Sequence, residues 1–279
     1  MMIDTYVDPS RKDECGSGRR SKSLNKVAYT SHDRCAWIGA IPSQRMRISV
    51  IIPTYNEAEN IGNAVRHLLS IGNSSGAEVI ISDGGSTDNT LAIAEAEGAT
   101  VTLSTIKGRA GQMNHGASLA HGDILHFVHA DTRPPVNSAA IVSAALASGA
   151  DHGSFRTRFD SDRFMLKVNA FFTRFDLPYF RGGDQSIWVT RDLFVRAGGY
   201  KTEMLIMEEY DLLARLRKIG TFHLSDQGTL ISARKYDHIS WLRVQLANMK
   251  VVRMYRRGAS QEEIVRTYGI MLNYRPNAS

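Results

Sequence analysis

An apolar run that ends at a proline constrains the fold of this chain more than any other feature of its sequence. Residues 48–52 are apolar apart from one serine, and they are followed directly by Pro53, Thr54, Tyr55, Asn56 and Glu57. A short apolar run bounded by a turn signal is typical of a buried strand. Open α/β sheets form their ligand crevices where such strands deliver polar groups into loops. The sequence therefore predicts a binding crevice at the carboxyl end of this strand.

Segments of helix and strand character alternate after this run. Helical spacing of apolar residues extends over 57–71, 89–97 and 108–122, and short apolar runs occupy 77–82, 100–104 and 124–128. The alternation predicts an α/β fold with a mainly parallel central sheet flanked by helices. Beyond residue 153 the pattern is less regular. There we expect strands at 153–159 and 186–189 and helices at 163–174, 191–197 and 208–218.

Composition favours one folded domain with tails. The 279 residues are 43% hydrophobic, which is enough for one sizeable core. We expect a disordered extension at 1–45, the folded domain at 46–235 and basic amphipathic helices at 236–279. The chain has two cysteines, in no zinc or disulfide pattern, and no apolar run near the ~20 residues of a membrane span. These features predict a cytoplasmic protein, and Met46 is a second possible start of translation.

Asp83 ends the second predicted strand, where a dinucleotide-binding fold keeps the acid that binds the ribose. No glycine-rich fingerprint follows the first strand, so an NAD-dependent dehydrogenase is disfavoured. A nucleotide bound in another way stays open. An aspartate before Gly84 and Gly85 is equally a normal turn residue. The sequence leaves both interpretations of Asp83 open.

Asp131 follows the predicted strand at 124–128, two residues after His129. We expect Asp131 to end this strand beside His129, and period-two geometry then places both side chains on one face. A carboxylate there suits Mg²⁺ or Mn²⁺, with diphosphate oxygens as further ligands. For an isolated aspartate, a structural turn role is the favoured alternative. Zinc is disfavoured, because His126 and His129 would point to opposite faces of one strand.

Three carboxylates fall within four residues at the start of the last predicted helix of the domain: Glu208, Glu209 and Asp211. Acids in a first turn compensate the helix dipole and need no substrate. Adjacent acids also repel, so that one pKa rises and that group can accept a hydroxyl proton. The pattern therefore predicts either a dipole-compensating turn or a general base.

The positive charge of the chain is concentrated at its end. Residues 231–279 carry nine basic and three acidic residues, which matches the formal charge of +6 for the whole chain. Apolar residues from Trp241 to Tyr255 alternate with arginines and Lys250, as in helices on anionic membranes. A packing helix with basic residues at its margins explains the pattern equally well. No nucleic-acid-reading motif is present, and no nucleic-acid partner is expected.

In their order and spacing, these segments resemble the motifs of family 2 glycosyltransferases with the GT-A (nucleotide-diphospho-sugar transferase) fold. The resemblance covers about residues 46–240 and rests on the segments 50–57, 83–88, 129–131 and 208–212. The segments 108–114, 129–132 and 183–185 further resemble a small bacterial subgroup whose genes often lie near radical-SAM genes. The acceptors of that subgroup are poorly defined.

The resemblance implies a role for each matching residue. Pro53, Tyr55, Asn56 and Glu57 would bind the nucleoside of the donor. Asp83 would contact the base, Arg109 would contact the base or the diphosphate, and Asp131 would bind the metal. His129 replaces the first acid of the family's D-x-D element, so His223 or His238 is a possible further ligand. Glu209 occupies the position of the catalytic base, and Glu208 competes for that role.

The resemblance implies an inverting, hexosyltransferase-like enzyme. It would move a sugar from a UDP- or GDP-linked donor to an unidentified hydroxyl acceptor. Mg²⁺ or Mn²⁺ would neutralise the leaving group, and Asp184 and Gln185 would orient the sugar or the acceptor, or form a structural turn. A catalytically idle nucleotide-sugar-binding module and a nucleotidyltransferase are the alternatives. The basic C-terminal segment predicts a possible peripheral attachment to the inner face of the membrane.

Overall fold

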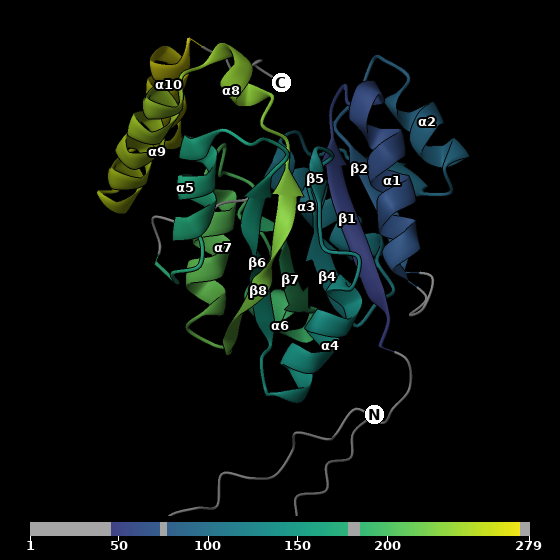
Figure 1. Ribbon diagram of the computed structural model, residues 1–279. Coiled ribbons are helices and arrows are strands. Elements are labelled where there is room, and N and C mark those ends of the chain that lie inside the picture. The colour runs from purple at the N-terminus through teal and green to yellow at the C-terminus, as the bar shows by residue number, and fades with distance from the viewer. Residues whose placement is uncertain (1–45, 73–76, 178–184, 274–279) are drawn as a thin grey trace, which may run out of the picture. The chain divides into compact units, whose positions relative to one another are not determined.

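The computed structural model describes residues 46–72, 77–177 and 185–273. Their strands form one sheet in the order β3-β2-β1-β4-β7-β6-β8-β5 (Figure 1). The strands are β1 (Ile48–Thr54), β2 (Glu78–Asp83), β3 (Thr100–Leu103), β4 (Ile124–Phe127), β5 (Thr132–Arg133), β6 (His152–Phe159), β7 (Ile187–Thr190) and β8 (Phe222–Ile231). The predicted disordered extension at 1–45 lies outside the described residues.

Helices cover both faces of this sheet. They are α1 (Ala58–Gly72), α2 (Thr90–Ala96), α3 (Arg109–Leu119), α4 (Ser138–Ala147), α5 (Phe164–Phe172), α6 (Arg191–Arg196), α7 (Glu208–Leu216), α8 (Lys235–His238), α9 (Trp241–Arg256) and α10 (Gln261–Leu272). The prediction of an α/β fold is confirmed, and most predicted elements begin and end within two or three residues of the observed ones.

The sheet is mixed rather than uniformly parallel. β1 pairs in parallel with β2 and β4, β2 with β3, and β6 with β8. β7 runs antiparallel to both β4 and β6, and β5 runs antiparallel to β8. β7 therefore runs opposite to its two neighbours, while the strands on either side of it run in the same direction. As a result, the carboxyl ends of β1, β2, β4, β6 and β8 share one edge of the sheet.

β1 continues two residues beyond the predicted strand. Pro53 lies inside it, opposite Ser82 of β2, and Thr54 lies opposite Asp83. On its other side, β1 is paired with β4 only as far as Ile51. The missing N–H of the proline therefore falls where no β4 partner requires it, which explains why the strand passes through Pro53.

The core lies on the two faces of the sheet, and alternate residues of β1 face each of them. Val50 and Ile52 belong to a cluster with α1, α2 and α4, whereas Ile51 packs with α3, α6 and α7. This two-sided burial explains why β1 is continuously apolar.

The sequence pattern predicted no element at α4, β5 or β8. α4 is rich in alanine and has almost no polar face, so its helical period is hidden. β8 carries polar residues and a glycine, and its register against β6 shifts at Ser154 and Arg156. A strand interrupted by a bulge lacks the regular alternation that identifies strands in a sequence.

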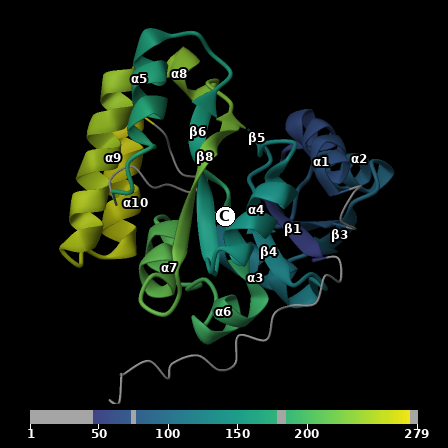
Figure 2. The same ribbon diagram turned by 60° about the horizontal axis from the view of Figure 1, so that its bottom comes forward.

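The C-terminal helices pack against the segment that leads into α7. α9 and α10 lie side by side next to α5 in both views (Figures 1 and 2). Val251, Val252 and Ile264 form an apolar cluster with Met204 and Met207. Among the described residues, no helix combines the length and apolar character needed to cross a bilayer.

Candidate active site at the carboxyl edge of the sheet

Hydrogen bonds join the loops that follow β1 and β2. Asn56 has a left-handed backbone with φ of 55°. Its N–H donates to Ser86 Oγ at 2.8 Å, and its side-chain oxygen accepts from the Thr87 N–H at 2.8 Å. The N–H of Glu57 donates to Thr90 Oγ1 at 2.8 Å. These contacts hold the two loops as one rim, and they give Asn56 a structural role there.

Asp83 is fully buried and shapes the turn after β2. Its carboxylate accepts hydrogen bonds from Thr54 Oγ1 at 2.9 Å, from the N–H groups of Gly85 and Ser86 at 2.8 and 2.7 Å, and from Ser86 Oγ at 2.6 Å. A carboxylate has about four acceptor positions, and the protein fills them all. The structure therefore supports the turn role of Asp83, and contact with a base would require one of these bonds to open.

The other residues predicted to bind the nucleoside lie on the same rim. Pro53 lines the pocket described below. Tyr55, two residues further along the chain, is 44% exposed. The Glu57 carboxylate is partly exposed and accepts a hydrogen bond from Asn60 Nδ2 at 2.7 Å, in the first turn of α1. Tyr55 is thus open to a ligand, whereas Pro53 is buried and Glu57 already has a partner.

α3 anchors the strand ends through side chains of the segment 108–114. Gln112 donates from Nε2 to the carbonyls of Thr54 at 2.6 Å and Ser82 at 3.0 Å. Asn114 exchanges two hydrogen bonds with the Tyr200 backbone, at 2.7 and 2.8 Å. The helix thereby fixes the end of β1 and the segment before α7 relative to each other.

The two glutamates at the start of α7 have different surroundings. Glu208 is fully buried, and its Oε1 lies 2.7 Å from Nε of Arg109 at the start of α3. Glu209 is 5% exposed, and its Oε1 lies 3.3 Å from Nε2 of His129. Two anions thus lie next to each other in the protein interior, each beside its own basic partner.

Their titration differs accordingly. Burial, together with the adjacent charge of Glu209, raises the pKa of Glu208 to about 7, although Arg109 opposes this. Burial also acts to raise the pKa of Glu209. The hydrogen bond from His129 and the charges of Arg109 and His129 outweigh it and lower the pKa of Glu209 to about 2.

Asp211, the third acid of the motif, is structural. Its carboxylate lies 2.7 Å from Arg215 Nε and 3.1 Å from Lys201 Nζ, and it accepts a hydrogen bond from the Tyr255 hydroxyl of α9. Arg215 continues the network to the carbonyl of Gly199 at 2.7 Å. Asp211 thus joins α7 to α9 and to the segment that carries Tyr200.

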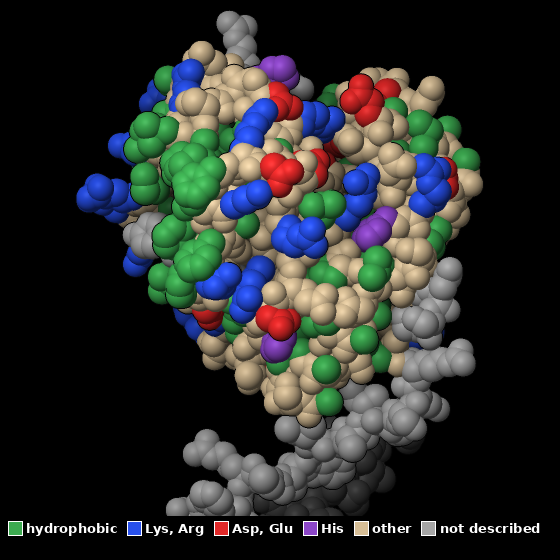
Figure 3. Space-filling model, in the orientation of Figure 1, with side chains coloured by type: hydrophobic (Ala, Val, Ile, Leu, Met, Phe, Trp, Pro, Cys, Tyr) green, Lys and Arg blue, Asp and Glu red, His purple; other side chains and the backbone are tan. Residues whose placement is uncertain are grey.

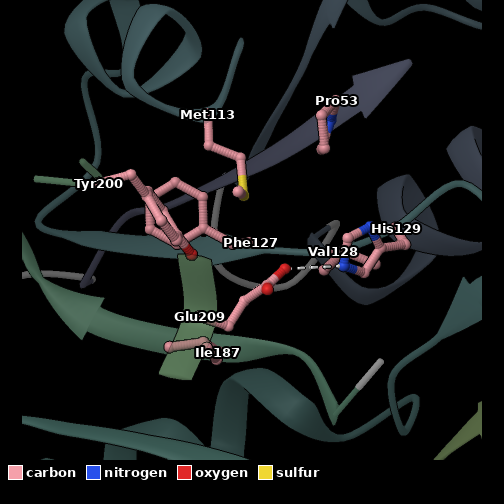
Figure 4. Close-up of a pocket in the computed structure, with 8 residues that line it drawn as sticks. All are labelled: Pro53, Met113, Phe127, Val128, His129, Ile187, Tyr200 and Glu209. Carbon is pink, nitrogen blue, oxygen red and sulfur yellow. Dashed lines mark ion pairs between the residues drawn. The ribbon is translucent and has the colours of Figure 1, made fainter. Parts of the chain in front are cut away.

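Glu209, and not Glu208, reaches the pocket at this edge of the sheet. Figure 4 shows the Glu209 carboxylate pointing between Pro53, Phe127 and His129, with the ion pair to His129 along one side. The residues that line the pocket are Pro53, Met113, Phe127, Val128, His129, Ile187, Tyr200 and Glu209. They come from the ends of β1 and β4, from α3, from the start of β7, from the segment between α6 and α7, and from the start of α7. The arrangement places one carboxylate at a small, closed hollow with largely apolar walls.

Asp131 lies in a turn and not on a continued strand. β4 ends at Phe127, and the Thr132 N–H donates to the His129 carbonyl at 3.0 Å. The expectation that strand geometry places His129 and Asp131 on one face is therefore wrong. Asp131 is exposed, and its Oδ1 accepts a hydrogen bond from Thr132 Oγ1 at 3.2 Å. An exposed carboxylate with acceptor positions left over fits a divalent ion that takes its other ligands from water or phosphate.

The histidines do not complete a protein-only metal site. Across the described ranges, no three His, Cys, Asp or Glu side chains are placed to hold a metal ion together. Thr132 lies opposite Ile231 at one end of β8, whereas His223 lies near the other end, about 25 Å along the strand. The suggestion that His223 assists Asp131 is therefore wrong. His126 is buried against Phe155, and burial lowers its pKa to about 4.

Of the two residues predicted to orient sugar or acceptor, Asp184 lies outside the described residues. Gln185 is buried directly before β7, which contributes Ile187 to the pocket. His238 is exposed at the end of α8.

Sequence reasoning missed the side chains that make the pocket apolar. Tyr200, Met113 and Phe127 were not singled out, although all three are buried and line it. Burial raises the pKa of the Tyr200 hydroxyl well above its usual value, and the charges of Glu209 and Glu208 act in the same direction. The sequence signal for Tyr200 is weak, since it is one aromatic residue after a glycine pair.

The sheet order and the loop-borne site at its carboxyl edge are those of the GT-A fold, an α/β fold of nucleotide-sugar transferases. The chain belongs to glycosyl transferase family 2, whose family model matches residues 49–206. An uncharacterized glycosyltransferase from Rickettsia felis (strain ATCC VR-1525 / URRWXCal2) is 39% identical over 85 residues, which are 30% of this chain. That match spans 29% of the length of the Rickettsia protein.

Solved structures show the same fold at low sequence identity. Mannosyltransferase PcManGT from Pyrobaculum calidifontis, in complex with GDP-Man and Mn²⁺, is 21% identical with a TM-score of 0.58. TarS 1–349 from S. aureus, in complex with UDP, is 17% identical with a TM-score of 0.57. Each match covers 82% of this chain and 71% of the other.

Proposed function

We propose that this protein transfers a sugar from a nucleotide-diphosphate donor to a hydroxyl acceptor, with inversion at the anomeric carbon and Glu209 as the general base. The observation that carries the proposal is the position of Glu209, whose carboxylate enters the pocket at the shared strand edge while Glu208 stays buried behind it. A general base must first reach the proton that it removes. The position of Glu209 at this hollow supports it as the base over Glu208, which is fully buried and does not line the hollow.

The depressed pKa of Glu209 makes it a weak base until a donor binds. Arg109 and His129 both lower that pKa through their positive charge. A diphosphate next to these cations would neutralise part of their charge and thereby raise the pKa of Glu209. Donor binding would then prepare the base for the acceptor hydroxyl. In-line attack from the side of this single base accounts for inversion.

Arg109 and Asp131 are the proposed diphosphate-binding groups. The Arg109 side chain is 46% exposed at the start of α3, so it can contact a ligand while it remains paired with Glu208. Asp131 would hold Mg²⁺ or Mn²⁺, which when bound supplies positive charge for the leaving diphosphate. The two similar structures contain GDP-Man and UDP, which supports a GDP- or UDP-linked donor.

We propose that Pro53 and Tyr55 contact the nucleoside of the donor, and that Asn56 and Glu57 hold the loop that carries them. Asp83 would act through the turn that it shapes. The sugar loop with Asp184 and Gln185, membership of the radical-SAM-associated subgroup and the hexosyltransferase subtype stay predictions.

The first experiment compares Glu209→Gln and Glu208→Gln with the wild type against UDP- and GDP-sugars with Mn²⁺. We expect Glu209→Gln to lower kcat by about 10²–10⁴ with little change in donor affinity, because only the proton acceptor is lost. Glu208→Gln should keep more activity. No turnover of any donor by the wild type would favour an idle binding module. Release of pyrophosphate from a nucleoside triphosphate incubated with a sugar 1-phosphate, in a separate assay, would favour a nucleotidyltransferase.

The second experiment tests the metal. Donor binding by wild type and Asp131→Asn is measured by calorimetry with Mn²⁺, with Mg²⁺ and with EDTA. We expect donor affinity to fall at least tenfold when either the metal or the carboxylate is removed, and the two losses should not add, because they break the same contact. Unchanged binding in Asp131→Asn would rule out this residue as the metal ligand.

A membrane surface is a proposed partner of the C-terminal helices. Leu242, Leu246 and Met249 are 47–60% exposed on one side of α9, and Arg253 and Arg256 follow in its last turn. An apolar stripe beside basic residues suits the interface of an anionic bilayer. Flotation with phosphatidylglycerol vesicles tests this proposal. Recovery of the protein only in the bottom fraction would reject it.

A further inference from the structure

A second hollow, separate from the Glu209 pocket, lies between α5 and the strands β6 and β8. Its volume is about 490 Å³, and its walls include Arg156 and Arg158 of β6 and Arg174 just after α5. The Thr157 N–H donates to Thr173 Oγ1 at 3.0 Å, which ties the end of α5 to β6. Figure 3 shows Lys and Arg side chains gathered over β6 and β8, beside hydrophobic side chains over α5. The hollow is therefore built from fixed elements and has a basic surface.

The charges that line this hollow do not balance. Among the described lining residues, the basic side chains are Arg156, Arg158, Lys167 and Arg174, and the acidic ones are Asp162 and Asp226. Asp162 is already paired with Lys167 at 2.8 Å. Three arginines thus remain for one carboxylate, an excess that an anionic ligand would neutralise.

Two of the arginines are held in place without a carboxylate partner in the described part of the chain. The Arg174 guanidinium stacks on the Phe171 ring, 3.9 Å from its centre. Arg156 Nε is buried and has no hydrogen-bond partner there. A buried donor without an acceptor is costly, and in native proteins it usually points to a missing partner. Guanidinium groups bind phosphates and carboxylates through paired hydrogen bonds.

The register of the sheet places this hollow next to the proposed reaction centre. Ser154 lies opposite Ile187, which lines the Glu209 pocket, and Arg156 is two residues further along β6, about 7 Å. On the other side, Leu230 of β8 lies opposite both Arg158 and Arg133, and Arg133 follows Asp131 by two residues. β6 lies three strands away from β1, about 14 Å. The hollow therefore lies beside the Glu209 pocket and away from β1, which carries the proposed nucleoside contacts.

We infer that this hollow binds an acidic group, a phosphate or a carboxylate, of the acceptor molecule. The inference rests on the proposed glycosyl transfer and narrows its acceptor to an anion. Arg156 and Arg158 would hold the acid, while a hydroxyl group of the same molecule extends toward Glu209. The acid belongs either to a small molecule or to the head group of a lipid, and binding measurements separate these two sources.

Calorimetry on the full chain saturated with UDP and Mn²⁺ tests the inference, because UDP blocks the donor site. The probes are glucose 6-phosphate and glucuronate, with glucose as the uncharged control, and vesicles of phosphatidylglycerol, with phosphatidylcholine as the control. The variants are Arg156→Gln/Arg158→Gln and, since Arg158 is exposed and its change should leave the fold intact, Arg158→Gln alone. Arg196→Gln is the control, an exposed arginine of α6 paired with Asp192.

We expect at least one acidic probe to bind at least tenfold more tightly than its uncharged control. The double variant should lose that preference, Arg158→Gln should weaken it, and Arg196→Gln should leave it unchanged, while UDP affinity stays constant throughout. Binding of phosphatidylglycerol vesicles alone, if the double variant loses it, would identify a lipid acid; vesicle binding that the double variant keeps would belong to α9 and would not support the inference. The inference is overturned if UDP binds but no acid is preferred, or if the double variant binds acids like the wild type. Failure of UDP to bind the wild type would instead count against the proposed function.

Discussion

At the scale of single residues, the direction of one side chain separates two adjacent glutamates. Glu208 points into the protein toward Arg109, and Glu209 points into the pocket toward His129. In the matching segments, the family's D-x-D element has an acid where this chain has His129, and the aspartate of its E-D motif is replaced here by Glu209. Glu209 and His129 face each other and form an ion pair, so each of these two departures from the family pattern supplies a partner for the other.

Replacing His129 should shift the pH dependence of the reaction. The His129 hydrogen bond and charge lower the pKa of Glu209, so His129→Asn should raise that pKa. Activity needs the ionised carboxylate, and the acid limb of kcat/KM should therefore move upward by about one pH unit or more. His121→Asn, at an exposed histidine beside Glu78, is the control and should leave the profile unchanged. An unshifted acid limb in His129→Asn would contradict this account.

Glu208 should make the folded state less stable as the pH rises. Its pKa is raised from 4.5 to about 7, so the folded protein favours the protonated carboxyl. That advantage is complete below pH 4.5 and is lost as the pH rises through 7. In urea unfolding, the wild type should lose roughly 1–3 kcal/mol relative to Glu208→Gln between pH 4.5 and 8. Relative to Glu262→Gln, a change on the exposed surface of α10, the wild type should show no such loss. Equal losses relative to both variants would refute the assignment to Glu208.

At the scale of elements, α3 links the strand ends to the start of α7. Its Arg109 pairs with Glu208 of α7, and its Gln112 binds the ends of β1 and β2. Its Asn114 binds the backbone of Tyr200. The helix can do this because it packs closely on β1. A Cβ atom at Gly116 would lie 2.6 Å from Cγ2 of Ile51 and 3.3 Å from Cβ of Ser82.

Gly116→Ala tests this close packing. Alanine in a helix normally stabilises relative to glycine by up to about 1 kcal/mol. Here the methyl group meets a buried β-branched side chain, and we expect a net loss of about 1–3 kcal/mol in denaturant unfolding, with a raised donor KM. Ser118→Ala, exposed on the same helix, should change stability by less than about 0.5 kcal/mol. A stabilised Gly116→Ala would show that α3 has room to move away from β1.

At the scale of the whole molecule, the C-terminal helices support the start of α7. Met207, the residue before Glu208, has a left-handed backbone with φ of 67° and is buried in the cluster with Val252 and Ile264. Such a conformation is unfavourable for a non-glycine residue and persists where packing fixes it. α9 and α10 therefore help to position both glutamates.

Removing part of this support should lower stability and activity together. Ile264 is fully buried, and Ile264→Ala should cost about 2–4 kcal/mol and reduce kcat severalfold. Ile270→Ala, on the same helix, removes a side chain that is 69% exposed and should cost less than about 0.5 kcal/mol. Chemical denaturation and steady-state kinetics on both variants measure these effects. Full activity in a destabilised Ile264→Ala would separate the C-terminal cluster from the site.

The sequence alone determined the α/β class, the alternation of elements as far as β4 and the edge of the sheet where the polar residues gather. These follow from periodicity and turn residues, which are local. Only the tertiary structure decided three further points. β7 runs antiparallel to its neighbours, the Asp83 carboxylate accepts hydrogen bonds from its own turn and from Thr54, and Asp131 lies in a turn after β4. The tertiary structure also decided which glutamate reaches the pocket, because burial and charge partners such as Arg109 and His129 come from segments that lie far apart in the sequence.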